Sequence, residues 1–350
     1  MRETTIAVPG LGFMRIFSAL TGLLLLVGCA TDRSASSLHR YEFSSPHMGT
    51  LFTITLYAPD DATAKTAVTA AFARVAELDA IMSDYQADSE LMRLCDQPPG
   101  TPVPISADLF QALQVSQEFA RLSGGAFDVT VGPFVRLWRF SRKRKILPTP
   151  AEMETARAAV GWRKLRLDPN ARTATLLVPN MRLDLGGIGK GYAADQALTV
   201  LRKHGLSRAL VAASGDIAIG DPPPGERGWK IAIAGLDSTP NAILHNAGVS
   251  TSGDTEQFVE ISGVRYSHIV DPTTGLGLTN HLQDTVIAPN ATTSDGLDTT
   301  VNVLGRDRGL KLVDSLPHTA ALILTEEKGV KRSFASKGFG RLAKAQRNRD

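Results

Sequence analysis

The sequence predicts an α+β fold in which mixed, largely antiparallel sheets are flanked by helices. Alternating or β-branched segments and amphipathic helical segments both occur along the 350 residues. They do not follow the regular strand-helix-strand repeat of a doubly wound parallel sheet, and no internal repeat is visible. With 43% apolar and 21% charged residues, the chain can bury one large or two moderate cores, which excludes global disorder.

Residues 1–28 have the pattern of a lipoprotein signal peptide. A basic start precedes an apolar run that is too short to span the ~30 Å core of a bilayer. The run ends in Leu26-Val27-Gly28-Cys29, which matches a lipobox and predicts that Cys29 carries lipid. A buried core segment that ends in a chance cysteine is the alternative, and Met14 is an alternative start. We expect a lipid-anchored protein on the periplasmic side of a bacterial membrane, with the inner membrane favoured.

The rest of the chain is expected to form a tether over residues 29–40, a folded domain over 41–330 and a basic tail over 331–350. Cys95 has no disulfide partner once Cys29 carries lipid, so it is expected to be an inert buried thiol. The net charge of +3 is small, and we interpret the basic tail as a solvated end. No nucleic-acid partner is expected.

The folded part is predicted to begin with a strand and two helices. Apolar residues alternate over Leu51–Tyr57, which indicates a half-buried strand. Apolar spacings of three and four then predict a helix capped by an aspartate at position 60 or 61 and reaching Met82. A second helix is predicted over Ser106–Leu122, with Gly124 and Gly125 as its stop.

Farther along, Arg142–Lys145 and two nearby prolines predict a loop. Strands are predicted over residues 176–178, 209–219, 230–234, 284–288 and 319–325, between glycine and proline turns. Ser294 is expected to be the N-cap of a further helix that ends at Gly305.

The most informative turn is Asp184-Leu-Gly-Gly-Ile-Gly-Lys-Gly-Tyr192. Its glycine spacing matches neither a P-loop nor a dinucleotide fingerprint. Four glycines around Lys190 nevertheless let the backbone approach a ligand, expose several N–H groups and bring one cation to a helix start. That combination suits a phosphate or diphosphate, although a tight strand-to-helix turn with a solvated lysine explains the pattern equally well.

Three weaker signals follow. The segments Ala213–Ile217 and Ser250–Asp254 place hydroxyl residues and an aspartate around a glycine, and structural turns are the commoner explanation for each. His268 lies at the end of a strand-like piece, where it suits a general base, whereas most lone histidines are surface or structural residues.

A candidate magnesium site lies in the last predicted helix. Asp295 and Thr299 are four residues apart and therefore share one face, with Asp298 alongside. A carboxylate, a hydroxyl and nearby carbonyl oxygens form a hard oxygen set that suits Mg²⁺. Acidic residues that complement a helix dipole are the simpler alternative. No Cys/His spacing indicates zinc.

Taken together, these segments resemble the FAD:protein FMN transferase (ApbE) family from about Met48 to Thr325. The matching pieces occur in the order of the family. They are Met48-Gly-Thr50, Met82-Ser-Asp-Tyr85, Gly125-Ala-Phe-Asp-Val-Thr-Val-Gly-Pro-Phe134, Asp184–Asp195, Ser214-Gly-Asp216, Ser250–Gly253, His268-Ile-Val-Asp-Pro272, and Asp295 with Thr299.

The resemblance implies a single, T-fold-like catalytic domain and assigns roles to residues of this chain. FAD would be lined by Met48, Tyr85, Ala126, Phe127, Asp128, Asp184, Lys190 and Ile269. Mg²⁺ would be held by the Gly187 carbonyl, Asp295 and Thr299, and His268 would be the base for the acceptor hydroxyl.

The resemblance further implies transfer of FMN from FAD to a threonine or serine, with AMP as the leaving group. The acceptors would be flavoprotein subunits of membrane redox complexes, with a segment resembling Asp-Gly-x-Ser/Thr-Gly/Ala-Ala-Thr. Two alternatives remain: a Mg²⁺-dependent pyrophosphatase that splits FAD into FMN and AMP, and a non-catalytic FAD-binding lipoprotein.

Overall fold

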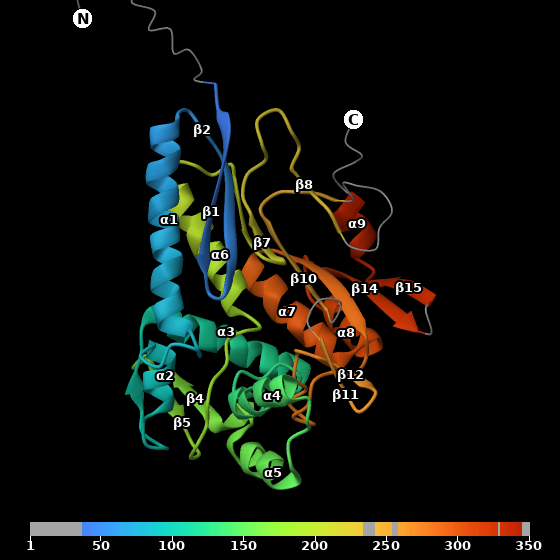
Figure 1. Cartoon of the computed structure of the whole chain (residues 1–350). Helices are drawn as coiled ribbons and strands as arrows, with labels where there is room; N and C mark the ends of the chain where they lie inside the picture. Colours follow the sequence, from blue (N-terminus) through green and yellow to red (C-terminus); the bar gives the residue numbers. More distant parts are fainter. Residues whose placement is uncertain (1–36, 234–241, 254–257, 328–329, 345–350) are drawn as a thin grey trace, which may run out of the picture. The chain divides into compact units, whose positions relative to one another are not determined.

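An eight-stranded antiparallel sheet forms the centre of the molecule in the computed structural model, which describes residues 37–233, 242–253, 258–327 and 330–344 (Figure 1). The strand order is β1-β2-β6-β7-β10-β13-β14-β15, and every neighbouring pair is antiparallel. The strands are β1 His39–His47, β2 Thr50–Ala58, β6 Ala209–Ala213, β7 Asp216–Ile219, β10 Ala247–Gly253, β13 Leu282–Ala288, β14 Ala320–Glu327 and β15 Val330–Ala335.

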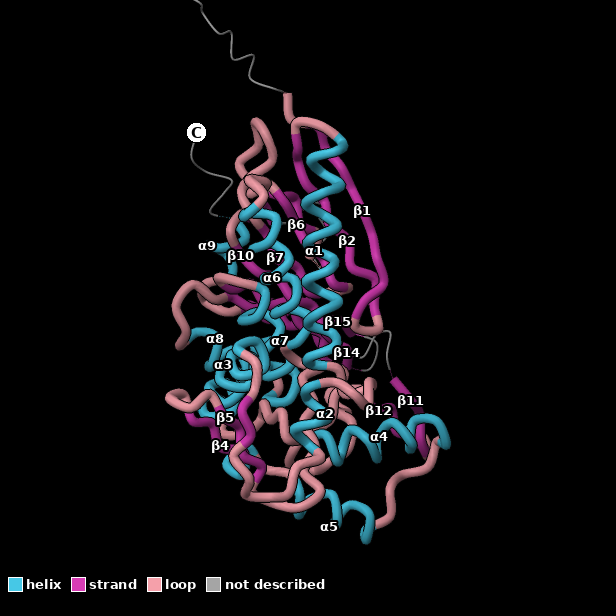
Figure 2. The backbone as a smooth tube through the Cα atoms, turned by 90° about the vertical axis from the view of Figure 1, so that its left-hand side faces the viewer, coloured by secondary structure: helices cyan, strands magenta, loops and turns pink. Residues whose placement is uncertain are grey.

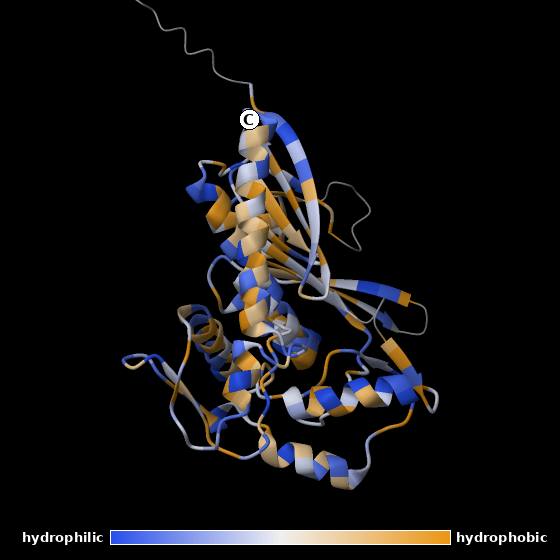
Figure 3. Cartoon of the chain, turned by 60° about the vertical axis from the view of Figure 1, so that its left-hand side comes forward, coloured by the Kyte–Doolittle hydropathy of each residue, from blue (hydrophilic) through white to orange (hydrophobic). Residues whose placement is uncertain are grey.

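Three helices pack on one face of this sheet: α1 Asp61–Met82, α6 Gly189–Lys203 and α7 Ala291–Leu304 (Figures 1 and 2). Figure 3 shows that α1, the long upright helix, carries both hydrophobic and hydrophilic residues, because one stripe of it is buried and the other is solvated. Phe52, Ile54 and Leu56 of β2 are fully buried in the same core as Ala67 and Leu78 of α1. Helix α8, Arg306–Asp314, lies beside α7.

A smaller core lies against β7, β10, β13 and β14. It contains Trp229 and Ile231 of β8, Leu244 of β9, and Phe339 and Ala343 of α9. The elements are β8 Trp229–Ile231, β9 Ala242–Leu244 and α9 Phe339–Lys344. Because this core is separate from the one under α1, apolar residues are buried on both faces of the sheet.

A helical region occupies one end of the molecule, at the bottom in Figure 1. Its helices are α2 Glu90–Cys95, α3 Ala107–Ser123, α4 Gly132–Arg144 and α5 Pro150–Ala159, with a 3-10 turn at Trp162–Lys164. Its strands are β3 Val103–Pro104, β4 Leu165–Asp168 and β5 Thr173–Leu176, and the hairpin β11 Phe258–Ile261 with β12 Val264–Ser267 packs on α4. None of the helices in the described ranges is long and apolar enough to cross a bilayer.

Most predicted elements are confirmed, and so is the α+β class. Asp60 caps α1 through a 2.7 Å bond from the Thr63 amide, and Gly124 ends α3 in the left-handed conformation. Cys95 is a buried free thiol whose pKa rises to about 11, chiefly because burial disfavours the thiolate. Cys29, the signal peptide and residues 29–36 of the tether lie outside the described residues.

Three local predictions are wrong. Helix α7 begins three residues before Ser294, and Asn290 is its N-cap because its side chain accepts from the Thr293 amide. The loop predicted at Arg142–Lys145 is the last turn of α4, where basic residues complement the helix dipole. The strand predicted over residues 176–178 lies earlier in the chain, at Thr173–Leu176, because its pairing with β4 ends at Leu176.

The predicted limits of the folded part are also too narrow. The tether was expected to reach residue 40, but β1 begins at His39. The tail from residue 331 onward contains most of β15 and all of α9, since pairing with β14 and burial of Phe339 hold this segment on the sheet. Ser250–Gly253 is part of β10 and is not a turn.

Candidate functional site

The glycine turn at the start of α6 and the acidic face of α7 meet in the interior. The Gly191 amide donates to the Asp295 carboxylate at 2.9 Å. A Cβ atom placed on Gly187 would lie 2.8 Å from the Thr299 hydroxyl, so only glycine leaves that hydroxyl in place. The two segments expected to share a diphosphate therefore do converge, although 104 residues separate Gly191 from Asp295.

Lys190 lies among carboxylates from two elements, β7 and α7. Its ammonium pairs with Asp216 on β7, and Asp295 and Asp298 of α7 are close enough to act on it electrostatically. Burial by itself would lower the pKa of Lys190, but these carboxylates raise it above the ordinary value. Lys190 is therefore a fixed cation at the start of α6.

The carboxylates of the site are not fully compensated by that lysine. Burial and the nearby Asp216 raise the pKa of Asp295 to about 7, against the opposing effect of Lys190. Burial, followed by the charge of Asp284 on β13, raises the pKa of Asp298 well above its usual range. One oxygen of Asp284 is buried without a hydrogen-bond partner in the structure. The site thus holds more buried carboxyl groups than Lys190 alone can pair with, and their raised pKa values favour the protonated forms.

The expected magnesium ligands fit a hard cation by their chemistry. Asp295 supplies a carboxylate, Thr299 a hydroxyl next to Gly187, and the turn at Gly187 supplies backbone carbonyl oxygen. A divalent cation at this position would favour the ionised form of these carboxyl groups. Among the described residues, no group of three or more His, Cys, Asp or Glu side chains is arranged to hold a metal, and the expected set contains one carboxylate only.

Tyr85 is joined to the glycine turn by Arg139 of α4. The Arg139 guanidinium lies 4.1 Å from the centre of the Tyr85 ring, and it forms ion pairs with Asp84 and Asp184. Asp184 also accepts from the Gly186 amide at 2.8 Å. Tyr85 remains 78% exposed, so its ring can stack on a planar ligand.

The other residues expected near FAD include Met48, beside the start of α6, and Asp128, in the loop before α4. Met48 has a left-handed backbone, and its methyl group is 3.7 Å from where a Cβ on Gly189 would be, so it lies beside the start of α6. Asp128 is buried, and its carboxylate accepts from both Thr130 groups and from the Trp162 amide. Asp128 therefore shapes the backbone of its loop.

Ala126 and Phe127 belong to that same loop. Phe127 is buried against Phe119, with ring centres 5.7 Å apart, while Ala126 is half-buried. The loop continues to Val129, whose carbonyl accepts from the Asp184 amide at 2.8 Å. The loop therefore lies next to the turn that carries Asp184.

His268 and Ile269 lie directly after β12, in a segment held by α4. The Trp138 indole donates to the Ser267 carbonyl at 3.0 Å, and the Ile269 amide donates to the Ser267 hydroxyl at 3.1 Å. Both His268 and Ile269 are half-buried. Since Arg139 follows Trp138 in the chain, neighbouring residues of α4 contact the His268 segment and the Asp184 turn.

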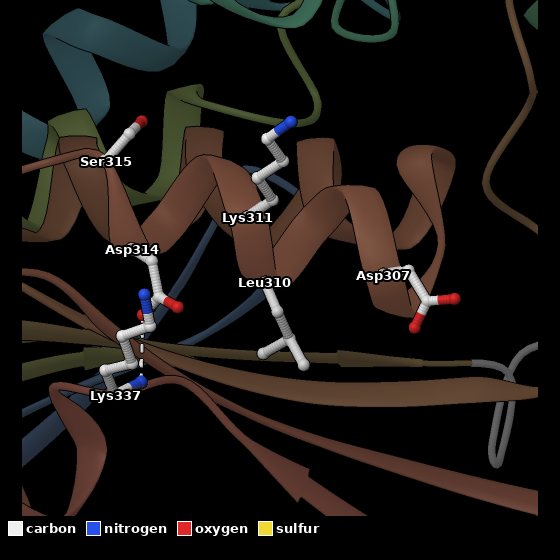
Figure 4. Close-up of a pocket in the computed structure, with 6 residues that line it drawn as sticks. All are labelled: Asp307, Leu310, Lys311, Asp314, Ser315 and Lys337. Carbon is white, nitrogen blue, oxygen red and sulfur yellow. Dashed lines mark hydrogen bonds between the residues drawn. The ribbon is translucent and has the colours of Figure 1, made fainter.

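Sequence reasoning missed Arg139, Asp195 and Asp284 as parts of this site. Asp195 of α6 accepts from the Ala291 and Thr292 amides at 3.0 and 2.8 Å, and so fixes the start of α7 against α6. The sequence offers only a weak signal for these residues, because each acts on a segment far away in the chain. A separate surface pocket of about 480 Å³ beside α8 shares no residue with this site (Figure 4).

The comparisons with known proteins all match one family. The family model that matches is described as "ApbE family" and covers residues 48–323. The FAD:protein FMN transferase of Vibrio cholerae is 33% identical over 92% of this chain and 96% of its own. The protein of that name from Salmonella typhimurium is 31% identical over 89% of this chain and 93% of its own.

Solved structures agree with the sequence comparison. The flavin transferase ApbE from Vibrio cholerae is 30% identical, with a TM-score of 0.79 over 87% of this chain and 99% of its own. The flavinyl transferase ApbE from Pseudomonas stutzeri is 28% identical, with a TM-score of 0.78 over 88% of this chain and 98% of its own. The predicted mixed, antiparallel fold is therefore confirmed.

Proposed function

Because the chain belongs to the ApbE family, we propose that it transfers FMN from FAD to a threonine or serine hydroxyl of an acceptor protein and releases AMP. One observation carries the proposal: the glycine turn with Lys190 and the helix with Asp295 and Thr299 converge. A diphosphate bound there would meet backbone N–H groups, one fixed cation and a hard oxygen set.

In the proposed reaction, the acceptor oxygen forms a bond to the FMN phosphorus, and the bond from that phosphorus to the AMP oxygen breaks. His268 takes the proton of the acceptor hydroxyl. Lys190 stabilises charge that develops on the phosphate oxygens. Mg²⁺ held by the Gly187 carbonyl, Asp295 and Thr299 would neutralise further charge on the diphosphate.

Incubation of the protein with FAD, MgCl₂ and a purified acceptor tests this function. A mass gain of one FMN on the acceptor supports transfer. Free FMN and AMP without modified acceptor would point to a pyrophosphatase, and unchanged FAD to a binding protein. Replacement of MgCl₂ by EDTA is expected to abolish the mass gain.

His268→Ala is expected to bind FAD normally and to lose FMN transfer by about 100-fold or more, since general-base catalysis contributes on that order. The control is His204→Ala, which changes an exposed histidine at the end of α6. Transfer by the His268 variant at the rate of this control would remove His268 from the mechanism.

We also propose that the protein is anchored by lipid on Cys29 to the periplasmic side of the membrane, where redox-complex subunits would be its acceptors. The support is the signal-peptide pattern over residues 1–28. Cys29→Ser is expected to move the protein from the membrane fraction to the soluble fraction of cells. Retention of the variant in the membrane fraction would contradict the anchor.

A further inference from the structure

The end of α4 exposes basic and apolar side chains together, at Phe140 and residues 142–147, here called the α4 surface. Phe140 is 50% exposed, Ile146 66% and Leu147 37%. Arg142, Lys143, Arg144 and Lys145 lie between them. The Arg144 guanidinium lies 6.0 Å from the centre of the Phe140 ring, and its charge acts on the Glu152 carboxylate. In Figure 3 the last turn of α4 is hydrophilic and the chain after it is hydrophobic.

The conformation of this segment is defined by hydrogen bonds. Lys145 ends α4 in the left-handed conformation with φ 54°, and its amide donates to the Ser141 carbonyl. The Ile146 amide approaches the same carbonyl at 3.4 Å. Complementing the helix dipole accounts for the basic residues, but it does not account for three large apolar side chains in solvent.

A groove lies along the earlier part of α4, and Leu137 in its lining is one helical turn before Phe140. It has a volume of about 470 Å³ and runs between α4 and α5. Its lining includes Pro133, Arg136 and Leu137 of α4 with Ala151, Thr155 and Ala159 of α5. The lining also contains Glu152, but Arg136 and Arg182 outnumber it. The groove therefore suits an apolar side chain of a polypeptide with acidic neighbours, whereas a flat lipid surface would leave it unfilled.

The same helix leads into the candidate site. Arg136, Arg139 and Lys143 recur at spacings of three and four and so share one face of α4. Arg139 contacts Tyr85 and pairs with Asp184 of the glycine turn. A partner lying along α4 is therefore next to the residues proposed to hold FAD.

We propose that the α4 surface and the groove along α4 dock the acceptor protein, through an acidic segment beside the hydroxyl that receives FMN. This inference rests on the proposed function, because it names how the acceptor of that reaction is recognised. Apolar and arginine side chains are enriched in protein interfaces, and complementary charge selects partners and speeds their encounter.

The test compares two carrier proteins as acceptors. Both display the segment Asp-Gly-Ala-Thr-Gly-Ala-Thr, flanked by four glutamates in one and by four serines in the other. For the wild-type protein, the KM of the acidic acceptor is expected to be lower by about tenfold. In the combined variant Arg142→Gln, Lys143→Gln, Arg144→Gln, Lys145→Gln, this preference is expected to disappear.

The matched control removes the same number of charges elsewhere. It combines Arg166→Gln, Lys203→Gln, Lys331→Gln and Arg332→Gln, all at exposed positions away from α4. The control is expected to retain the preference. In both variants, FAD affinity and FAD hydrolysis by water should equal those of the wild type, since neither set of residues contacts the glycine turn.

Each other outcome contradicts the proposal. An unchanged preference in the α4 variant, or an equal loss in the control, would show that the α4 surface does not recognise the acceptor. If the α4 variant kept the acceptor KM of the wild type but bound phosphatidylglycerol vesicles more weakly, the α4 surface would bind lipid instead. Absence of FMN transfer by the wild type to either acceptor would refute the proposed function itself.

Discussion

Single residues of the site are linked by contacts that no local pattern contains. Arg139 is the clearest case. Its guanidinium contacts the Tyr85 ring and pairs with Asp84 and Asp184, which precede and follow Arg139 in the chain. The arrangement holds the exposed Tyr85 ring at a fixed distance from the turn that carries Asp184. If Tyr85 stacks on the flavin, Arg139 sets where that ring binds.

Arg139→Met tests this role of Arg139. Loss of a cation–π contact and of a half-buried ion pair is worth about 1–2 kcal/mol, which corresponds to roughly a tenfold weaker affinity for FAD. The measurement is quenching of flavin fluorescence on binding. Arg136→Met, one turn earlier on α4, is the control and should leave the affinity unchanged, so equal effects of the two variants would remove Arg139 from the flavin site.

At the scale of elements, the site depends on how closely α6 approaches α7. A Cβ atom on Gly191 would lie 2.2 Å from the Ala291 carbonyl oxygen, which no native contact allows. Asp195 adds hydrogen bonds from α6 to the first turn of α7. The glycines of the turn therefore serve the packing of two helices as well as the approach of a ligand.

Two glycine substitutions in the same turn separate these effects. Gly191→Ala is expected to destabilise the protein by about 1–3 kcal/mol, since the helices must move apart. Gly189→Ala is expected to be neutral or slightly stabilising, because its nearest neighbour would be 3.7 Å away. The midpoints of urea denaturation report both, and equal midpoints would contradict the close packing of α6 on α7.

At the scale of the whole molecule, the buried carboxylates make stability depend on pH. Burial, with Asp216 next in importance, raises the pKa of Asp295 from 3.8 to about 7 in the folded protein. Burial raises the pKa of Asp284 and Asp298 well above 3.8. At pH values between 3.8 and these raised pKa values, the folded state binds more protons than the unfolded state. The free energy of unfolding therefore falls as the pH rises through this range.

Thermal unfolding at pH 5 and pH 8 measures this effect. Without Mg²⁺, the protein is expected to melt at a lower temperature at pH 8, because the three carboxylates must ionise together. MgCl₂ should reduce the difference in melting temperature between pH 5 and pH 8, because Mg²⁺ binds beside Asp295. Asp298→Asn should reduce the same difference when Mg²⁺ is absent. A melting temperature that does not decrease from pH 5 to pH 8, or a difference that Mg²⁺ does not change, would contradict this role of the buried carboxylates.

The sequence by itself determined the elements that depend on local pattern. The alternation of Phe52, Ile54 and Leu56 predicts β2, the cap at Asp60 predicts the start of α1, and Gly124 predicts the end of α3. The spacing of Asp295 and Thr299 likewise places both on one helical face. These features are encoded within a few residues, so the chain specifies them before it folds.

Only the tertiary structure decided which distant segments meet. The start of α7 is fixed partly by Asp195 on another helix, and β15 forms because β14 offers it an edge to pair with. The ion pairs of Arg139 and of Lys190 join residues that no sequence spacing relates. Long-range packing and electrostatics set these contacts, and both depend on positions in space that local propensity does not contain.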